Sequence, residues 1–166
     1  EIGLRYKYKI SEYFALGGDL NFSTDMYNFD MEQPASAGYK SEYYSLNSWG
    51  LSVFTRFNIG KRGNTLGTYV DLLGYGQWNP GRYYTYFKEE DSSDPMLSHS
   101  ATKQVVYNRL DFLSKTSAGA GLRVGHKGIS IVAMYRLTDL VLTDMVPALM
   151  PHGELPALNL GLEIGF

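Results

Sequence analysis

The chain has 166 residues, enough for one domain spanning 1–166, and its formal charge of −2 argues against nucleic acid as a partner, because nucleic-acid-binding domains carry a basic face. It has no cysteine, which excludes disulfides and Cys-based metal sites. No stretch approaches the roughly 18 apolar residues of a transmembrane helix, which excludes a helical membrane protein but not a transmembrane β-barrel, whose strands face a polar lumen on one side.

Stretches of about ten residues along the chain alternate between apolar and polar side chains, which is the period of a β-strand. In chain order the predicted strands are 1–10, 14–24, 48–60, 65–77, about 110–124, 129–138 and 157–166. Phe54 and Leu73 interrupt the polar side of this alternation. Ten residues is the length that a tilted strand needs to cross a bilayer, about 9–11, and exceeds the usual globular strand of about 5–6.

The connections between these strands come in two sizes that alternate along the chain. Short polar turns are expected at 11–13, 61–65 and 125–128, and long connections at about 25–47, 79–108 and 139–155. Outer-membrane barrels show this alternation, with short periplasmic turns and long external loops. The prolines lie in the long segments, with Pro156 at the border of the last predicted strand, so we expect none inside a strand.

The ordering of turns also predicts the topology. If the short turns face the periplasm, both the first and the last strand run downward. Such barrels close with an even number of antiparallel strands, which seven strands cannot do. The predicted fold class is therefore all-β, an antiparallel up-and-down transmembrane β-barrel of about eight strands. We expect its first, upward strand to be missing before Glu1, either trimmed or supplied by another polypeptide.

The polar side of the alternation predicts a charged interior. The inward residues are Arg5, Lys7, Lys9, Asp19, Arg56, Asp71, Arg123, Arg136 and Glu163. An eight-stranded barrel is just wide enough for its side chains to fill it, so these charges must pair and hydrogen-bond with one another. The excess of cations leaves open a second interpretation, a narrow ion path or a cationic binding cavity.

Aromatic residues accumulate on the apolar side of the predicted strands, among them Tyr6, Tyr8, Trp49 and Tyr135. Tyr and Trp concentrate at lipid headgroup level, which favours a membrane-embedded outer face. In a soluble β-sandwich binding module the same residues would form the core. That alternative predicts extraction in buffer without detergent.

The candidates for chemistry in this sequence are weak. His99 has Ser98 and Ser100 beside it, but sequence proximity in a polar loop does not establish the geometry of catalysis. The acidic run "KEEDSSDP" (88–95) lacks the residue order of a calcium loop and is expected to be a solvated tip. We therefore predict no enzyme activity, no catalytic or metal-binding residue and no cofactor.

The long connections interleave tyrosines with polar residues. Their contact candidates are Tyr27, Tyr39, Tyr43, Tyr44, Tyr83, Tyr84 and Tyr86. Tyrosine supplies a large contact area at low entropy cost, so a binding surface is one interpretation. Extension of the β-hairpins beyond the membrane is the other.

Two stretches resemble a known family. The C-terminal "LNLGLEIGF" is similar to the terminal strand of Gram-negative outer-membrane barrels, which the barrel assembly machinery recognises; its signal residues here are Leu158, Leu160, Leu162, Ile164 and Phe166. The stretch 109–140 resembles the small PorT-like outer-membrane barrels of Bacteroidota. The resemblance implies a bacterial outer-membrane location, outer-membrane lipid as the surroundings, and the assembly machinery as a partner during insertion.

Together these patterns predict an integral outer-membrane β-barrel with a side-chain-filled lumen. Its expected role is structural, or that of an accessory subunit of a cell-envelope complex that contacts other envelope proteins through its external loops. The alternatives are a small passive porin or channel and a lipid-modifying barrel enzyme.

Overall fold

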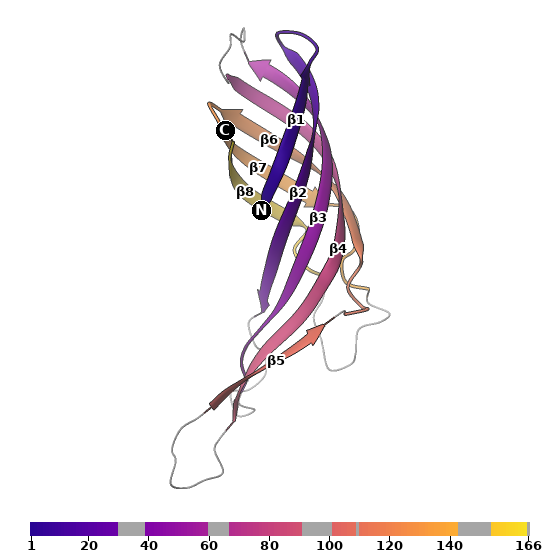
Figure 1. The fold of residues 1–166 in the computed structure, drawn as a ribbon, viewed down its shortest axis with the longest axis vertical. Coiled ribbons are helices and arrows are strands. Elements are labelled where there is room, and N and C mark those ends of the chain that lie inside the picture. Colours follow the sequence, from indigo (N-terminus) through magenta and orange to yellow (C-terminus); the bar gives the residue numbers. More distant parts are fainter. Residues whose placement is uncertain (30–38, 60–66, 91–100, 109, 143–153, 166) are drawn as a thin grey trace.

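A computed structural model describes residues 1–29, 39–59, 67–90, 101–108, 110–142 and 154–165. These ranges are all-β and contain no helix (Figure 1). Their strands are β1 (Ile2–Lys9), β2 (Phe14–Phe29), β3 (Tyr39–Ile59), β4 (Thr68–Glu90), β5 (Ala101–Asn108), β6 (Thr116–His126), β7 (Ile129–Arg136) and β8 (Leu158–Ile164).

The strands form one curled antiparallel sheet with the order β1-β2-β3-β4-β6-β7-β8. Figure 1 shows this sheet curling into a half-barrel, with the β1–β2 turn at one end and the β4–β5 hairpin protruding at the other. The predicted all-β antiparallel architecture is confirmed. Closure is not observed, because β1 and β8 remain the two edges of the sheet in the described residues.

The strand bounds correct the prediction of long connections at 25–47 and 79–108. Much of both segments is strand, because β2, β3 and β4 extend well beyond the predicted bounds and β5 pairs with the outer part of β4. Tyrosines that alternate with polar residues suit a pleated strand, and Tyr44 and Tyr84 form a cross-strand pair with ring centroids 5.3 Å apart. The predicted strand at 110–124 begins later than expected, at Thr116.

Pro80 contradicts the expectation that no proline lies inside a strand. Trp49 pairs with Trp78 and Asn47 pairs with Gly81, so β4 has an additional residue at this point and forms a bulge. Here β4 also changes partner, from β6 to β5. A missing N–H is tolerated at this position, because the ladder is already interrupted.

The β6–β7 connection is a two-residue hairpin turn. His126 pairs with Ile129, and the two residues between them, Lys127 and Gly128, have φ angles of 47° and 89°. Positive φ at both central positions defines the type I′ turn that matches the twist of the flanking strands.

The two faces of the sheet differ in chemistry. Large apolar side chains on the convex face are exposed, with Leu4 at 78% and Leu160 at 73%. Other members of this apolar belt are Ile2, Leu20, Leu51, Val53, Leu72, Leu122, Val124, Ile131 and Leu162. Buried charged residues lie on the concave face, including Asp19, Arg56, Asp71 and Arg123. This distribution is the reverse of that in a water-soluble domain.

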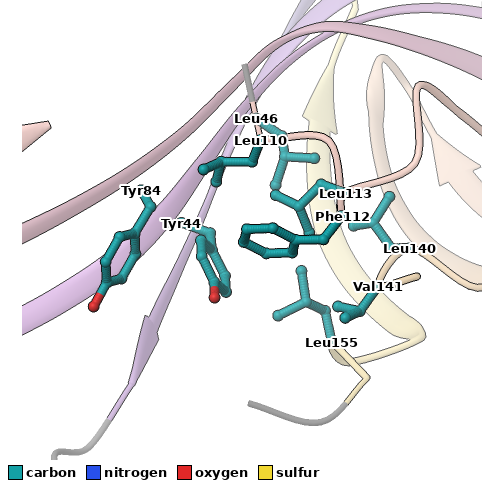
Figure 2. Close-up of a cluster of buried hydrophobic side chains, with 9 residues drawn as sticks. All are labelled: Tyr44, Leu46, Tyr84, Leu110, Phe112, Leu113, Leu140, Val141 and Leu155. Carbon is teal, nitrogen blue, oxygen red and sulfur yellow. The ribbon is translucent and has the colours of Figure 1, made fainter. Parts of the chain in front are cut away.

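A small hydrophobic core fills the concave side near the protruding hairpin (Figure 2). We call it the apolar cap; its buried members are Tyr44, Leu46, Tyr84, Leu110, Phe112, Leu113, Leu140, Val141 and Leu155. They come from β3 and β4 and from the connecting segments before β6, after β7 and before β8. The connecting segments therefore fold back against the sheet and form the cap together with β3 and β4.

Candidate functional site

Six charged side chains on the concave face form one ion-pair network at a single level of the sheet. We call it the inner network; its members are Arg5, Asp19, Arg56, Asp71, Arg123 and Glu163. They come from β1, β2, β3, β4, β6 and β8 in that order, so positive and negative side chains alternate around the sheet. Three guanidinium groups face three carboxylates, and their formal charges cancel.

The register of the strands brings these charges together. Arg5 is directly opposite Asp19, and Asp71 is directly opposite both Arg56 and Arg123. Directly opposed residues have their Cβ atoms about 4.5–5.5 Å apart, so paired charges meet without distorting the backbone.

Arg123 is the centre of the network. Its Nη2 donates to Asp19 Oδ2 at 2.8 Å and its Nη1 donates to Asp71 Oδ2 at 3.1 Å. Its Nε lies 2.8 Å from Glu163 Oε2. One guanidinium thus joins carboxylates from three strands that are not neighbours of one another, which fixes the curvature of the sheet.

Arg56 and Asp71 form the most buried pair. Two parallel hydrogen bonds join them, from Nε at 2.6 Å and from Nη2 at 2.7 Å, and their side chains are 3% and 0% exposed. The Arg56 guanidinium also lies 3.4 Å from the centroid of the Tyr69 ring. Bidentate pairing and stacking on an aromatic face are what guanidinium groups do better than ammonium groups.

The position of the Phe54 side chain explains why this apolar residue interrupts the polar side of the alternation. Its ring lies on the concave face with the guanidinium carbons of Arg5, Arg56 and Arg123 at 5.8, 5.3 and 5.5 Å from the centroid. An aromatic face attracts cations at such distances, so Phe54 belongs with the inner network. Tyr69 was missed for the same reason, because a search for charged residues passes over the rings that stack on them.

Inward glycines make room for these rings. A Cβ at Gly17 would lie 2.3 Å from the Phe54 ring, and one at Gly125 would lie 2.3 Å from the Tyr69 ring. The glycines of β2 and β6 are therefore complementary in shape to the aromatics of β3 and β4.

The edges β1 and β8 face each other across an opening that we call the seam. Arg5 Nη2 on β1 donates to Glu163 Oε2 on β8 at 3.0 Å, so side chains bridge the seam. Two cavities of about 760 and 290 Å³ border it, and both are lined by Asp19 and Glu163. The larger extends past Lys7 and Gly165, and the smaller past Asp25 and Asn159.

Three predicted inward residues lie outside the inner network. Lys7 is half-buried and lines the larger cavity, while Lys9 is exposed at the end of β1. Arg136 belongs to the cap, where its Nη2 donates to Glu154 Oε1 at 2.5 Å and to the Leu155 carbonyl at 2.7 Å.

Glu154 ties the connecting segments of the cap together. Its carboxylate accepts hydrogen bonds from the backbone N–H groups of Leu140 at 2.9 Å and Val141 at 3.0 Å, besides the bond from Arg136. Across the cap, Arg82 Nε donates to the Leu110 carbonyl at 3.0 Å. Buried backbone groups of the cap thus find charged partners, as buried polar groups require.

The tyrosines predicted as loop contacts lie on strands, and several pack inward. Tyr44 and Tyr84 are buried in the cap, with Tyr27 and Tyr86 packed against it, so Tyr44 and Tyr84 cannot form an exposed contact surface. Burial, together with the nearby Glu42 carboxylate, raises the pKa of Tyr44 to about 12. Tyr43 and Tyr83 keep part of their surface exposed, and the side chain of Tyr39 lies outside the described residues.

The predicted assembly-signal strand is the edge strand β8. Leu158, Leu160, Leu162 and Ile164 point outward and are exposed, and Phe166 lies outside the described residues. The predicted loop chemistry cannot be placed, since Ser98, His99, Ser100, Asp91, Asp94 and the side chains of 88–90 lie outside the described residues. Within the ranges that are described, no group of three His, Cys, Asp or Glu side chains could hold a metal ion. Those ranges also contain no helix with the length and apolarity to cross a membrane.

Comparison with protein-family models, with curated proteins and with solved structures finds no match to this chain.

Proposed function

We propose that this chain forms the wall of an integral outer-membrane β-barrel whose interior is filled by side chains, with a structural or accessory role in the cell envelope. The observation that carries the proposal is the reversed distribution of polarity. Leu4, Leu51 and Leu160 are more than half exposed on the convex face, while Arg56, Asp71 and Arg123 are buried on the concave face. Lipid is the solvent in which this distribution is stable.

Two layers on the concave side support a filled interior. The inner network occupies the middle of the sheet, and the apolar cap occupies the end near the protruding hairpin. A balanced set of buried ion pairs provides rigidity but no free charge for an ion to exchange with. We therefore favour a structural role over a passive porin, and we propose that the wall is completed to an eight-stranded barrel.

The sequence patterns support the location, family and partners that we propose. The exposed leucines of β8 and the resemblance of the C-terminal strand to a barrel-assembly signal support insertion by the barrel assembly machinery. The resemblance to PorT-like proteins of Bacteroidota supports an outer-membrane location. Tyr43 of β3 and Tyr83 of β4 keep part of their surface exposed, and we propose that they contact other envelope proteins.

Membrane extraction tests the proposal. We expect the protein to stay with outer membranes through an alkaline carbonate wash, to require detergent for release, and to migrate differently on gels before and after heating. Release into buffer as a soluble protein would contradict the proposal and favour a β-sandwich.

A matched pair of variants sharpens this test. Leu122→Arg places a charge on the apolar belt, which costs roughly 2–4 kcal/mol at the bilayer midplane, so we expect reduced membrane insertion. Asn108→Arg adds the same charge at an exposed position of β5, beyond the belt, and should insert normally.

Planar-bilayer recordings separate the structural role from the porin. The filled interior predicts no conductance above background. Stable single-channel steps that disappear when the larger cavity is filled by Gly161→Phe would favour the porin instead.

A further inference from the structure

We propose that the seam is an acceptor site for one additional extended β-strand of about the length of β1, which runs antiparallel to β1 and β8 and carries apolar side chains outward and small or hydrogen-bonding side chains inward. This inference rests on the proposed membrane location. It specifies the direction, length and side-chain pattern of the partner.

The direction follows from the parity of the sheet. Seven strands follow one another antiparallel from β1 to β8, so the two edges run in the same direction. Direct pairing of β1 with β8 would create a parallel pair in an otherwise antiparallel sheet. A second copy inserted in the same orientation offers only the same two downward edges, so it cannot provide the missing direction either.

The backbone supplies the driving force. Among the described residues, no strand pairs with the outer edge of β1, which has 8 residues, or with that of β8, which has 7. Each unsatisfied backbone group in hydrocarbon costs several kcal/mol, so an open edge is not stable in a bilayer. One inserted strand satisfies both edges at once.

The outward side chains of the partner must be apolar. On β1 the residues that flank the seam on the convex face are Ile2, Leu4, Tyr6 and Tyr8, and on β8 they are Leu158, Leu160, Leu162 and Ile164. A polar outward residue between these two rows would interrupt the apolar belt.

The inward side chains are specified by what already occupies the seam. At the level where Arg5 meets Glu163, two long side chains cover the space, which favours a small residue such as Gly, Ala or Ser. On either side of this level lie the cavities of about 760 and 290 Å³, whose linings include Lys7, Asn21 and Asn159. Larger hydrogen-bonding side chains such as Gln or Thr fit there.

Cysteine pairs test the width of the seam, since the chain has no cysteine of its own. A disulfide needs Cα atoms roughly 4.4–6.8 Å apart, whereas two strands with one between them are roughly 10 Å apart. We expect the Leu4→Cys/Leu162→Cys variant, purified in detergent, to form no internal disulfide on oxidation but to be joined by a longer bismaleimide. The control is Ile131→Cys/Leu162→Cys, whose residues are direct partners in β7 and β8 and should form the disulfide.

A synthetic strand tests occupancy. The probe is a peptide of the length of β1, with Val outward, Gln and Thr inward, Ser at the centre of the inward face and one outward Cys. We expect mixed disulfides with both single variants, Leu4→Cys and Leu162→Cys, at a yield roughly tenfold above that of a scrambled peptide, because a one-residue slip turns every side chain to the wrong face.

Three results would overturn the proposal. They are an internal disulfide in the Leu4→Cys/Leu162→Cys variant, equal reaction of the single variants with the scrambled peptide, and disulfide-linked dimers of the whole chain in place of the peptide adduct. Each can occur in a protein that stays in the membrane fraction, so they leave the proposed function intact. Release into buffer would instead contradict the proposed function itself.

Discussion

At the scale of single residues, the inner network is a set of charges that stabilise one another, because five of the six have an opposite charge directly across the ladder and Glu163 reaches Arg5 and Arg123 through its side chain. Buried ion pairs gain little over apolar packing, but breaking one leaves an uncompensated charge. Arg123 contacts Asp19, Asp71 and Glu163, so its removal takes a partner from three carboxylates, whereas Arg5 pairs with two and Arg56 with one.

We expect Arg123→Met to lower the free energy of unfolding by about 3–5 kcal/mol, because the carboxylates around it lose their shared partner. Urea unfolding in lipid vesicles, followed by tryptophan fluorescence, measures this. Lys9→Met removes an exposed cation from β1 and should change stability by less than about 0.5 kcal/mol. Equal effects of the two substitutions would contradict the assigned role of the network.

Gly17→Ala tests the fit between glycines and rings. The added methyl would lie 2.3 Å from the Phe54 ring and 2.5 Å from the Tyr6 carbonyl, so we expect a loss of about 1–3 kcal/mol by overpacking. Gly74→Ala is the control, since its Cβ meets nothing within 4 Å. The same unfolding assay compares the two, and a neutral Gly17→Ala would show that Phe54 lies elsewhere.

At the scale of elements, two-residue alternation was sufficient to predict the path of the sheet. It located the strands from β1 to β4 and from β6 to β8, because a strand with one face in each environment must alternate. It fails where both faces are aromatic, so it predicts long connections where the structure has the outer parts of β3 and β4 and all of β5. The tyrosines there form a core of their own, which polarity alone does not reveal.

The residues of the inner network could also be predicted in part from the sequence. The inward position of Arg5, Asp19, Arg56, Asp71, Arg123 and Glu163 follows from alternation, but their pairing depends on register. Register is set by turns and bulges, such as the one at Pro80, and a single sequence shows these poorly. The cap was not predicted, because its apolar residues are scattered over connecting segments with no period.

The cap should make stability sensitive to alkali. Burial raises the pKa of Tyr44 to about 12, above the ordinary value of roughly 10. The neutral phenol is therefore compatible with folding below pH 10, and its contribution is lost as pH rises from about 10 towards 12. We expect the Tyr44→Phe variant to lose less stability over this interval than the unchanged protein, in urea unfolding at a series of pH values. Parallel pH profiles for the two proteins would contradict burial of Tyr44 in the cap.

At the scale of the whole molecule, the fold combines an apolar outside with a charged inside and a hydrophobic cap at one end. The inner network joins strands that are not neighbours, and the cap fills the end near the β4–β5 hairpin. In the part of the chain that the structure describes, the seam leaves the outer edges of β1 and β8 unpaired. Each of these features suits the lipid bilayer that we propose surrounds the sheet. In water the same sheet would expose its leucines to solvent and bury its arginines away from it, and both arrangements would cost free energy.

The most direct test of the central claim uses the two tryptophans of the chain. Trp49 and Trp78 are direct cross-strand partners on the convex face and are 49% and 55% exposed. If the convex face lies in lipid, phospholipids brominated on their acyl chains should strongly quench the fluorescence of reconstituted protein, and the Trp49→Phe and Trp78→Phe variants should each keep that quenching. Unquenched, water-like emission from protein bound to the same vesicles would contradict a lipid-facing outer surface.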